Sequence, residues 1–456
     1  MSLGGPGMTM NVDWIEMGSR GVELLQALLR IDTRNPPGNE QPAAEFVAKQ
    51  LRAVGLEPRF FEGQTGRTNV VCRIEGSGEA GGPLLLAGHL DVVPVEEEHW
   101  EVDPFGGIIK DGYLYGRGAI DMKNHVVASL VMMEILARKG IRPRRDIIFA
   151  AVADEEEGCR WGSRYMVENH PDEVRADWML GEVGGFSQYI NGTCYYPIMI
   201  AEKGRALIRM TARGEPGHGS MPHQAMAMTQ LGEALARLGK TRLPQHNTAV
   251  MERFLTVLGE TQSPPAKWVL PQLLNQRLSG VLLERVLPGN LAKSLGCLLA
   301  NTAAPTVLQS GTKFNVIPSE VSCLIDGRIL PGQTPGDLVR ELRELLGEGL
   351  EFEVLEAFPG IEQPEPESAL YDLITGALGK HDPASVPLPY LVAGFTDAQY
   401  FSRLGARCYG FAPLRFPEHH NVTFSELFHG HNERIYVEGY RWGLRVLWDV
   451  VSQFVL

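Results

Sequence analysis

The first half of the chain contains three short apolar runs, each followed by side chains that can bind a metal ion. The runs occupy residues 84–86, 147–152 and 178–180. Such runs are typical of strands that are buried on both faces of a parallel sheet. The side chains that follow them are His89 and Asp91, the acidic residues 154–157, and Glu182. Because open α/β sheets bind ligands where their strands end, the pattern predicts a functional site at that edge.

Helical periodicity surrounds these strands. Apolar spacing predicts two helices within residues 13–55, and a breaker cluster at residues 35–39 separates them. We interpret this pair of helices and its loop as scaffold. A further helix is expected through residues 127–135, closed by Gly140. Asp121 lies just before that helix, and taken alone it would be interpreted as an N-cap.

A change of pattern near Lys203 predicts a second unit. Strands are expected at residues 206–211, 306–309, 321–325 and 352–355, and helices at residues 224–238 and 337–346. The Leu-rich residues 247–299 are helical in pattern, with a Pro-rich break at 263–265, and we interpret them as an insertion carried by this unit. A Pro-rich stretch at residues 361–367 marks the return to the first unit.

These elements predict an α/β fold with a mainly parallel sheet flanked by helices. A smaller α+β domain, serving as a lid or for dimerisation, is expected to be inserted in it. The predicted boundaries are residues 11–202 and 359–456 for the two parts of the first domain and 203–358 for the inserted one. With 456 residues and 44% hydrophobic content, the chain is long enough for two domains.

The net charge of -13 disfavours nucleic acid and anionic membranes as partners, because both require a basic face and the chain has no Lys/Arg run. The six cysteines lack CxxC spacing, which argues against a disulfide framework and a thiolate zinc site. The first ten residues contain no apolar segment typical of a signal peptide, and no stretch approaches the roughly 20 apolar residues of a membrane span. We therefore expect a cytoplasmic protein.

The candidate ligands supply nitrogen and oxygen but no sulfur. They are His89, Asp121, Glu156, Glu182 and His429. Mixed histidine and carboxylate sets of this size suit two metal ions about 3.5 to 4 Å apart. Each has a plainer interpretation: an acidic run is usually a solvated loop, and a lone histidine is usually a surface residue. Four acids directly after a buried strand are poorly placed for solubility alone, since they would repel one another without bound cations.

At these residues the sequence resembles the M20 metallopeptidase family, the group of acetylornithine deacetylase, succinyl-diaminopimelate desuccinylase, aminoacylase-1 and glutamate carboxypeptidase. The resemblance extends from about Asp32 to the C-terminus. It is carried by the motifs GHLDVVP, GRGAIDMK, ADEEEG, LGEVGG and HGHNE. It implies the α/β catalytic domain and the inserted domain described above, and two divalent metal ions. Zinc suits the ligands best, and cobalt or manganese are alternatives.

The resemblance assigns roles to the ligands. His89 and Glu182 correspond to ligands of one ion, and Asp91 to the residue that orients the imidazole of His89. Asp121 resembles the carboxylate that bridges both ions, and the family tends to have a cis peptide after it. His429 corresponds to the histidine that completes the second ion. His431, in the same motif, is extra and could compete for metal or contact the substrate.

The motif ADEEEG matches the family's DEExG if Glu155 is the general base, Glu156 the ligand of the second ion and Glu157 the variable position. A shift by one residue would reassign both roles. The distance to Gly158 favours this register.

Further residues resemble contacts of the family with its substrate. His218, in GHGS, resembles a histidine that polarises the scissile carbonyl, often across a dimer interface. Asn315 and Arg328 resemble residues that hold the substrate carboxylate. Gly394 and Thr396, in GFTD, resemble pocket contacts. The insertion at residues 247–299 departs from the shortest family lids and leaves open whether His218 acts within its own chain.

The implied reaction is metal-assisted hydrolysis of an amide or peptide bond in a small substrate with a free carboxylate, by a water that bridges two ions and is deprotonated by Glu155. The substrate would be an N-acyl amino acid or a short peptide, cleaved by a deacylase or by a dipeptidase or carboxypeptidase. The inserted domain implies a homodimer. The alternative is a catalytically silent family member that binds a ligand or partner.

Overall fold

The computed structural model describes residues 12–363, 368–418 and 424–456 and forms two compact units. Unit 1 comprises the described residues within Met1–Ile198, Glu367–Pro387 and Tyr400–Leu456, and unit 2 those within Met199–Pro366 and Leu388–Gln399. The predicted boundaries of an inserted domain, and its role as a lid or dimerisation domain, stay predictions. Residue 11, residues 364–367 and the histidines at 419 and 420 lie outside the described residues.

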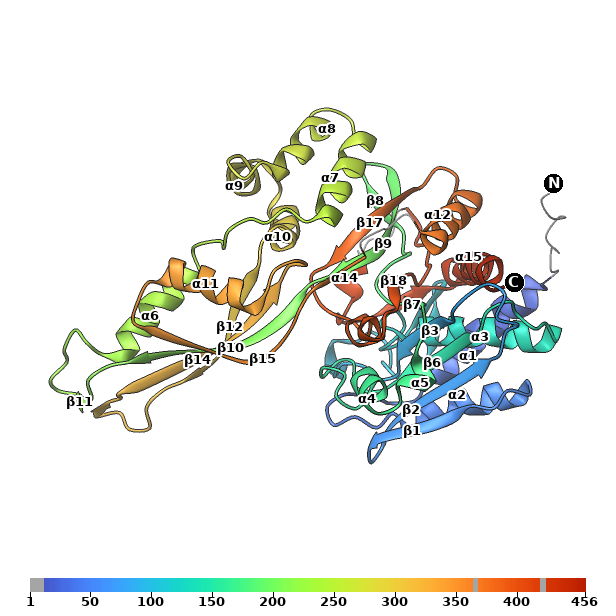
Figure 1. The fold of residues 1–456 in the computed structure, drawn as a ribbon, viewed down its shortest axis with the longest axis horizontal. Helices are drawn as coiled ribbons and strands as arrows, with labels where there is room; N and C mark the ends of the chain where they lie inside the picture. The colour runs from blue at the N-terminus through green and yellow to red at the C-terminus, as the bar shows by residue number, and fades with distance from the viewer. Residues whose placement is uncertain (1–11, 364–367, 419–423) are drawn as a thin grey trace. The chain divides into compact units, whose positions relative to one another are not determined.

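The central sheet of unit 1 has the order β1-β2-β6-β3-β7-β18 (Figure 1). The β6-β3, β3-β7 and β7-β18 pairs are parallel, whereas β1-β2 and β2-β6 are antiparallel. The strands of this sheet are β1 (Arg59–Gln64), β2 (Arg67–Ile74), β3 (Leu84–His89), β6 (Ile147–Val152), β7 (Trp178–Gly181) and β18 (Arg407–Gly410). Every residue of β3 and β6 is buried, which is why both strands read as continuous apolar runs.

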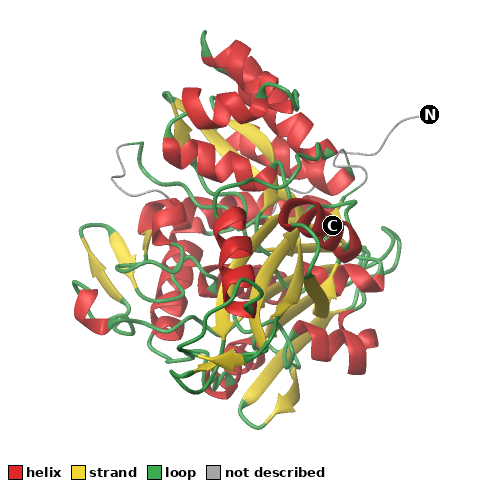
Figure 2. Cartoon of the chain, turned by 90° about the vertical axis from the view of Figure 1, so that its left-hand side faces the viewer, coloured by secondary structure: helices red, strands yellow, loops and turns green. Residues whose placement is uncertain are grey.

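Helices flank this sheet (Figure 2). The helices of unit 1 are α1 (Trp14–Leu29), α2 (Gln41–Ala53), α3 (Lys123–Lys139), α4 (Ser163–Asn169), α5 (Pro171–Val174), α12 (Ala369–His381), α14 (Phe424–Leu427) and α15 (Val437–Val455), with the 3-10 turns η1 (Glu97–His99) and η4 (Ser402–Leu404). The Asp13 carboxylate caps α1 by accepting two N–H groups of its first turn, and Gly140 ends α3 in the left-handed conformation. The predicted α/β fold with a mainly parallel sheet flanked by helices is confirmed.

Smaller strands complete unit 1. A three-stranded sheet has the order β19-β5-β4, formed by β19 (Arg434–Tyr436), β5 (Tyr113–Tyr115) and β4 (Ile108–Lys110). β8 (Gln188–Ile190) pairs antiparallel with the start of β9 (Thr193–Glu202). β9, β17 (Val386–Val392) and α13 (Ala398–Phe401) contain residues of both units.

Unit 2 contains an antiparallel sheet of order β12-β14-β10-β15, whose core packs against α6 and α11. The strands are β10 (Gly204–Arg213), β12 (Thr302–Gln309), β14 (Glu320–Ile329) and β15 (Leu350–Phe358), and the helices are α6 (Ala227–Leu238) and α11 (Pro335–Leu346). The two-stranded antiparallel sheet of β11 (Gly217–His218) and β13 (Val316–Ile317) and the short β16 (Ile361–Glu362) also belong to it. In β14 buried and half-buried residues alternate, as expected for a sheet with one covered face.

The region predicted as a helical insertion is helical. It contains α7 (Ala249–Thr261), α8 (Ala266–Val269), η2 (Leu270–Leu274), α9 (Ser279–Val281), the π-helical turn η3 (Leu282–Val286) and α10 (Gly289–Leu298). Among the described residues, no helix is both long enough and apolar enough to cross a membrane.

Candidate metal centre

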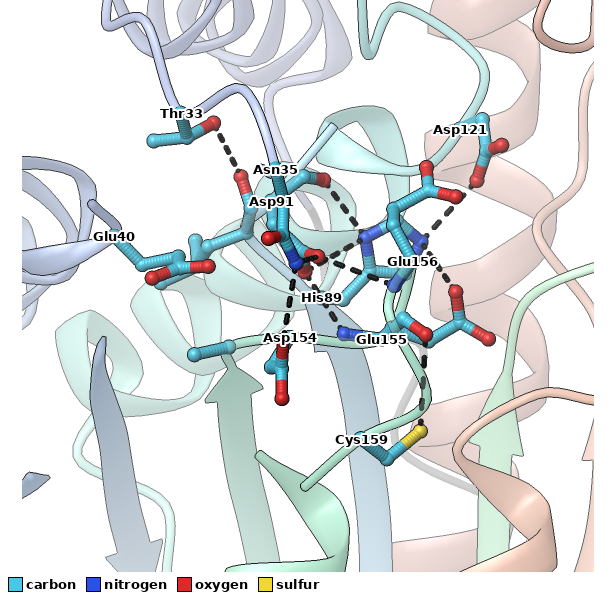
Figure 3. Close-up of polar contacts among 12 residues, drawn as sticks. Thr33, Asn35, Glu40, His89, Asp91, Asp121, Asp154, Glu155, Glu156 and Cys159 are labelled. Carbon is cyan, nitrogen blue, oxygen red and sulfur yellow. Dashed lines mark hydrogen bonds and ion pairs between the residues drawn. The ribbon is translucent and has the colours of Figure 1, made fainter. Parts of the chain in front are cut away.

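His89 lies at the end of β3 and is completely buried. Its Nδ1 is 2.9 Å from the main-chain oxygen of Asp91 and 3.5 Å from the Asp91 carboxylate, so the Nδ1–H donates within this loop (Figure 3). Its Nε2 is 3.2 Å from Oδ1 of Asp121 and 3.6 Å from Oε2 of Glu182. The imidazole is therefore oriented by Asp91 through one nitrogen and presents the other to two carboxylates.

The two carboxylate oxygens of Asp121 face two different histidines. Oδ1 is directed at His89, whereas Oδ2 lies 2.9 Å from Nε2 of His429. The same nitrogen of His429 is 3.2 Å from Oε2 of Glu156. The Asp121–Met122 peptide is cis, as the resemblance implied. The alternative of Asp121 as the N-cap of α3 is wrong, because Met122 is the N-cap and no side chain caps this helix.

The acidic turn after β6 is held by the Asp91 carboxylate. Its two oxygens accept the main-chain N–H groups of Glu155 and Glu156, each at 3.1 Å. Oε2 of Glu155 reaches to 4.0 Å from Nε2 of His89. Glu157, the variable position of the motif, is exposed. Asp91 thus fixes both the imidazole of His89 and the main chain that carries the two glutamates.

A buried network that the sequence did not predict lies behind Asp91. Nδ2 of Asn35 donates to the Asp91 carboxylate at 2.8 Å and to Asp154 at 3.1 Å (Figure 3). Arg67 donates to Asp154 at 2.8 Å and forms two hydrogen bonds of 2.7 Å with Glu40. Asn35 lies in the loop that we interpreted as scaffold, and its only sequence signal was the surrounding breaker cluster.

The described residues suit two metal ions. The two groups with potential ligand atoms within 4.8 Å of one another are His89, Asp121 and Glu156, and His89, Glu155 and Glu182. Ligands about 2.0–2.2 Å from a tetrahedral zinc ion would be about 3.3 Å apart, which is close to the spacings of His89 and His429 from their carboxylates. Oε1 of Glu156 is buried without a hydrogen-bond partner among the described residues. A bound cation would satisfy this buried acceptor.

The pKa values reflect this crowding. Burial would raise the pKa of Asp121, but hydrogen bonds to His429 and His89 outweigh it and hold the pKa well below its ordinary value. Burial, helped by the charge of Asp121, raises the pKa of Glu156 to about 7. Hydrogen bonds to Asp121 and Glu156 raise the pKa of His429 to about 10. Without metal ions, protons on these groups therefore compensate the negative charge that bound cations would otherwise compensate.

His218 belongs to unit 2 and is exposed on β11. Its Nδ1 accepts from the main-chain N–H of Ser220 at 3.2 Å and lies 2.7 Å from the Ser220 hydroxyl. In the neutral imidazole the proton is then on Nε2, which makes that nitrogen a donor. The exposed Asn315 accepts the N–H of Gly219 with its main-chain oxygen at 2.8 Å, so the two predicted substrate contacts lie on neighbouring segments.

Arg328 lies on β14 in unit 2, half-buried beside the segment that carries Gly394 and Thr396. Its guanidinium stacks over the ring of Phe395 at 5.7 Å and donates to Oδ2 of Asp326. Thr396 is buried, and its hydroxyl donates to Glu202 at 2.9 Å. The structure therefore brings Arg328 together with the GFTD motif. The hydroxyl hydrogen of Thr396 is already used within the protein.

His431 does not join the carboxylates of Asp121 and Glu156. It contacts Glu96 at 3.4 Å and packs against the ring of His99. Glu433, two residues further on, is completely buried and binds the loop that leads to Asp121. Glu433 is the last residue of the HGHNE motif, but the sequence alone predicted no role for it.

The fold and the site together define a metal-dependent hydrolase of amide bonds, and comparisons with known proteins agree. Residues 85–453 match the sequence model of peptidase family M20/M25/M40. The chain belongs to this family, in agreement with the resemblance in its motifs. The alternative of a catalytically silent member is therefore not favoured.

Several named relatives align with most of the chain. It is 29% identical over 388 residues to the N-fatty-acyl-amino acid synthase/hydrolase PM20D1 of Homo sapiens, covering 83% of this chain and 75% of the relative. It is 28% identical to aminoacylase-1A of Rattus norvegicus, covering 91% and 90%. A probable carboxypeptidase S-like 2 of Dictyostelium discoideum is 28% identical, covering 82% of this chain and 72% of the relative.

Solved structures share the fold at low sequence identity. The M20 family metallo-carboxypeptidase Sso-CP2 from Sulfolobus solfataricus superposes with a TM-score of 0.68 at 16% identity, covering 95% of this chain and 99% of that one. Human carnosine dipeptidase 1 gives a TM-score of 0.66 at 16% identity, covering 97% of both chains.

Proposed function

We propose that the site holds two divalent metal ions, most favourably Zn²⁺, with Co²⁺ or Mn²⁺ as alternatives for this nitrogen- and oxygen-rich set. His89 and Glu182 would hold one ion, His429 and Glu156 the other, and Asp121 both. The observation that carries the proposal is the orientation of Asp121, whose two oxygens lie 3.2 and 2.9 Å from the Nε2 atoms of different histidines. When bound, such ions lower the pKa of water and stabilise negative charge on a carbonyl oxygen.

Glu155 is proposed as the general base. The N–H bond to Asp91 fixes its main chain, and its carboxylate extends to 4.0 Å from Nε2 of His89. It would accept a proton from the attacking water and deliver that proton to the nitrogen of the leaving amine. His218 is proposed to donate its Nε2–H to the carbonyl oxygen of the scissile bond, within its own chain or from a partner.

The proposed substrate class is an N-acyl amino acid. The support is that relatives named for N-fatty-acyl amino acids and an aminoacylase share 28–29% identity with the chain, although a probable carboxypeptidase S-like 2 also shares 28%. Arg328 is proposed to bind the free carboxylate, for which its planar, two-pronged guanidinium is suited. Asn315, Gly394 and Thr396 are proposed as further contacts, and short peptides are the competing class.

A homodimer through unit 2 and a cytoplasmic location complete the proposal. β12 is at the edge of its sheet and exposes Val307 and Leu308, and an exposed edge of this kind favours pairing with a second chain. No two of the six cysteines form a disulfide bond, which fits a reducing compartment.

The test compares purified protein loaded with Zn²⁺, Co²⁺ or Mn²⁺ on a panel of N-acyl amino acids, dipeptides and N-acyl amino acid amides. We expect the N-acyl amino acids to be hydrolysed fastest and their amides, which lack the carboxylate, to be hydrolysed poorly. Glu155→Gln should keep its metal content and lose turnover by several orders of magnitude. Equal rates on acids and amides, or full activity of Glu155→Gln, would contradict the assignments.

A further inference from the structure

Glu433 is completely buried, and its carboxylate accepts four hydrogen bonds from one short loop. Oε1 accepts the main-chain N–H groups of Ile120 at 2.8 Å and Asp121 at 3.2 Å. Oε2 accepts the N–H of Gly118 at 3.1 Å and Nη1 of Arg117 at 2.8 Å. Because one of these donors is the main-chain N–H of Asp121, Glu433 fixes the backbone that carries the Asp121 carboxylate.

Arg117 links Glu433 to the main chain of His429. While its Nη1 binds Glu433, its Nη2 donates to the main-chain oxygen of His429 at 3.3 Å. The guanidinium also stacks over the ring of Trp100 at 5.4 Å, which limits its movement. His429 has a positive φ of 58°, an uncommon conformation for a residue other than glycine that needs support from its surroundings.

A strand pairing continues this contact. The N–H of Gly116 donates to the main-chain oxygen of Glu433 at 3.0 Å, and β5 pairs antiparallel with β19, with Tyr115 opposite Arg434. The two segments that carry Asp121 and His429 are therefore fastened together along their length. The contacts of this pairing that lie nearest to the candidate metal ligands are those of the Glu433 carboxylate and the Arg117 guanidinium.

The two halves of the candidate metal centre are thus supported differently. His89 is the last residue of β3 and Glu182 directly follows the neighbouring parallel strand β7, so both are positioned by the central sheet. His429 lies in a loop, and the 2.9 Å contact between its Nε2 and Asp121 depends on how that loop is attached. Partners one layer behind a metal ligand commonly change metal affinity by about 10- to 100-fold when they are removed.

We propose that the buried Glu433–Arg117 pair is a positioning device that sets His429 against Asp121, so that the ion held by His429 depends on it more than the ion held by His89. This inference rests on the proposed two-ion site. Neither residue reaches the candidate ligand atoms, so both act through the loops that they join. A carboxylate is required at position 433 because each of its two oxygens accepts two hydrogen bonds. An amide of the same size has only one acceptor oxygen, and its NH₂ group would face two of the N–H donors.

The experiment measures Zn²⁺ binding by calorimetry to metal-stripped wild type and Glu433→Gln, with the circular dichroism spectrum of both. We expect two ions in the wild type. In the variant we expect the affinity for one ion to fall by about 10- to 100-fold and the affinity for the other, which shares only Asp121 with the loop of His429, to fall by a smaller factor. Saturating Zn²⁺ should restore most of kcat, which loss of folded structure would not allow. Glu438→Gln, which removes an exposed ion pair with Arg441 on the adjoining helix, is the matched control and should bind both ions normally.

Each outcome has one meaning. Equal weakening of both ions, or two unchanged affinities in Glu433→Gln, overturns the positioning role. A wild type that binds fewer than two ions instead contradicts the proposed function. Should Glu433→Gln fail to fold, Arg117→Lys keeps the buried charge but cannot bind Glu433 and the oxygen of His429 together. It is expected to weaken the same ion more than the other, by a smaller factor than Glu433→Gln does, and unchanged binding in it overturns the proposal.

Discussion

Nδ2 of Asn35 lies 2.8 Å from Oδ2 of Asp91, and the same amide group is 3.1 Å from Oδ1 of Asp154. One amide therefore separates two buried carboxylates that would otherwise repel each other, and it connects the loop after α1 to the turn that carries Glu155. The contact gives this loop a part in forming the site.

Replacing Asn35 by Ala should lower stability and turnover together. It removes the donor shared by Asp91 and Asp154, and a buried acceptor without its partner costs about 1–3 kcal/mol. The thermal midpoint of the variant should fall by several degrees, and kcat should fall because the Glu155 turn is less well fixed. Asn39→Ala, at an exposed position of the same loop, is the control. A midpoint for Asn35→Ala that equals this control would refute the structural role.

Gly162 should not tolerate a side chain. A Cβ at this position would lie 1.7 Å from the main-chain oxygen of Ala153, directly before the acidic turn. Gly162→Ala should therefore destabilise the protein by about 1–3 kcal/mol and reduce activity by displacing that turn. Gly376→Ala, where nothing lies within 4 Å in the middle of α12, should be neutral or slightly stabilising. Comparable melting curves and rates for the two variants would argue against this account.

Metal affinity should rise with pH. The pKa of Glu156 is raised to about 7, mainly by burial, and that of His429 to about 10 by its hydrogen bonds to Asp121 and Glu156. Both groups must lose protons before they bind a cation, so protons compete with the metal below these values and cease to compete above them. Chelator competition between about pH 6 and 9 should show the affinity increasing through pH 7. An affinity independent of pH would be inconsistent with these ligands.

Arg328→Lys should raise KM for substrates with a free carboxylate by about 10-fold, because a lysine keeps the charge but loses the two-pronged contact. The amides of the same substrates should be affected little. Arg209→Lys, on the neighbouring strand and ion-paired with Glu353, tests whether any arginine of this sheet has the same effect. A parallel loss on acids and amides would assign Arg328 a structural role instead.

The parallel strands could be predicted from the sequence, whereas the edge strands could not. β3, β6 and β7 are buried on both faces and therefore appear as apolar runs. β1 is largely exposed and has no such run. The helix expected from residue 224 begins at Ala227, because the main chain of Met226 is extended. β12 extends from Thr302 although it was expected only from residue 306, since its residues are mostly exposed and it contains Pro305.

Motifs at strand ends were informative about the site because consecutive parallel strands bring their ends to one edge. His89, Asp121, Glu156, Glu182 and His429 lie together in unit 1, and their roles stay predictions. Asn35, Arg67 and Glu433 could not be found in this way. Their positions depend on loops from distant parts of the chain, and a buried polar side chain in a loop has no periodic pattern to distinguish it from an exposed one.

The bridging position of Asp121 is tested most directly by anomalous diffraction from crystals of the zinc-loaded protein. The account predicts two peaks about 3.5 to 4 Å apart. The Asp121 carboxylate should lie between them, with His89 on one side and His429 on the other. A single peak, or zinc bound away from Asp121, would contradict the two-ion centre.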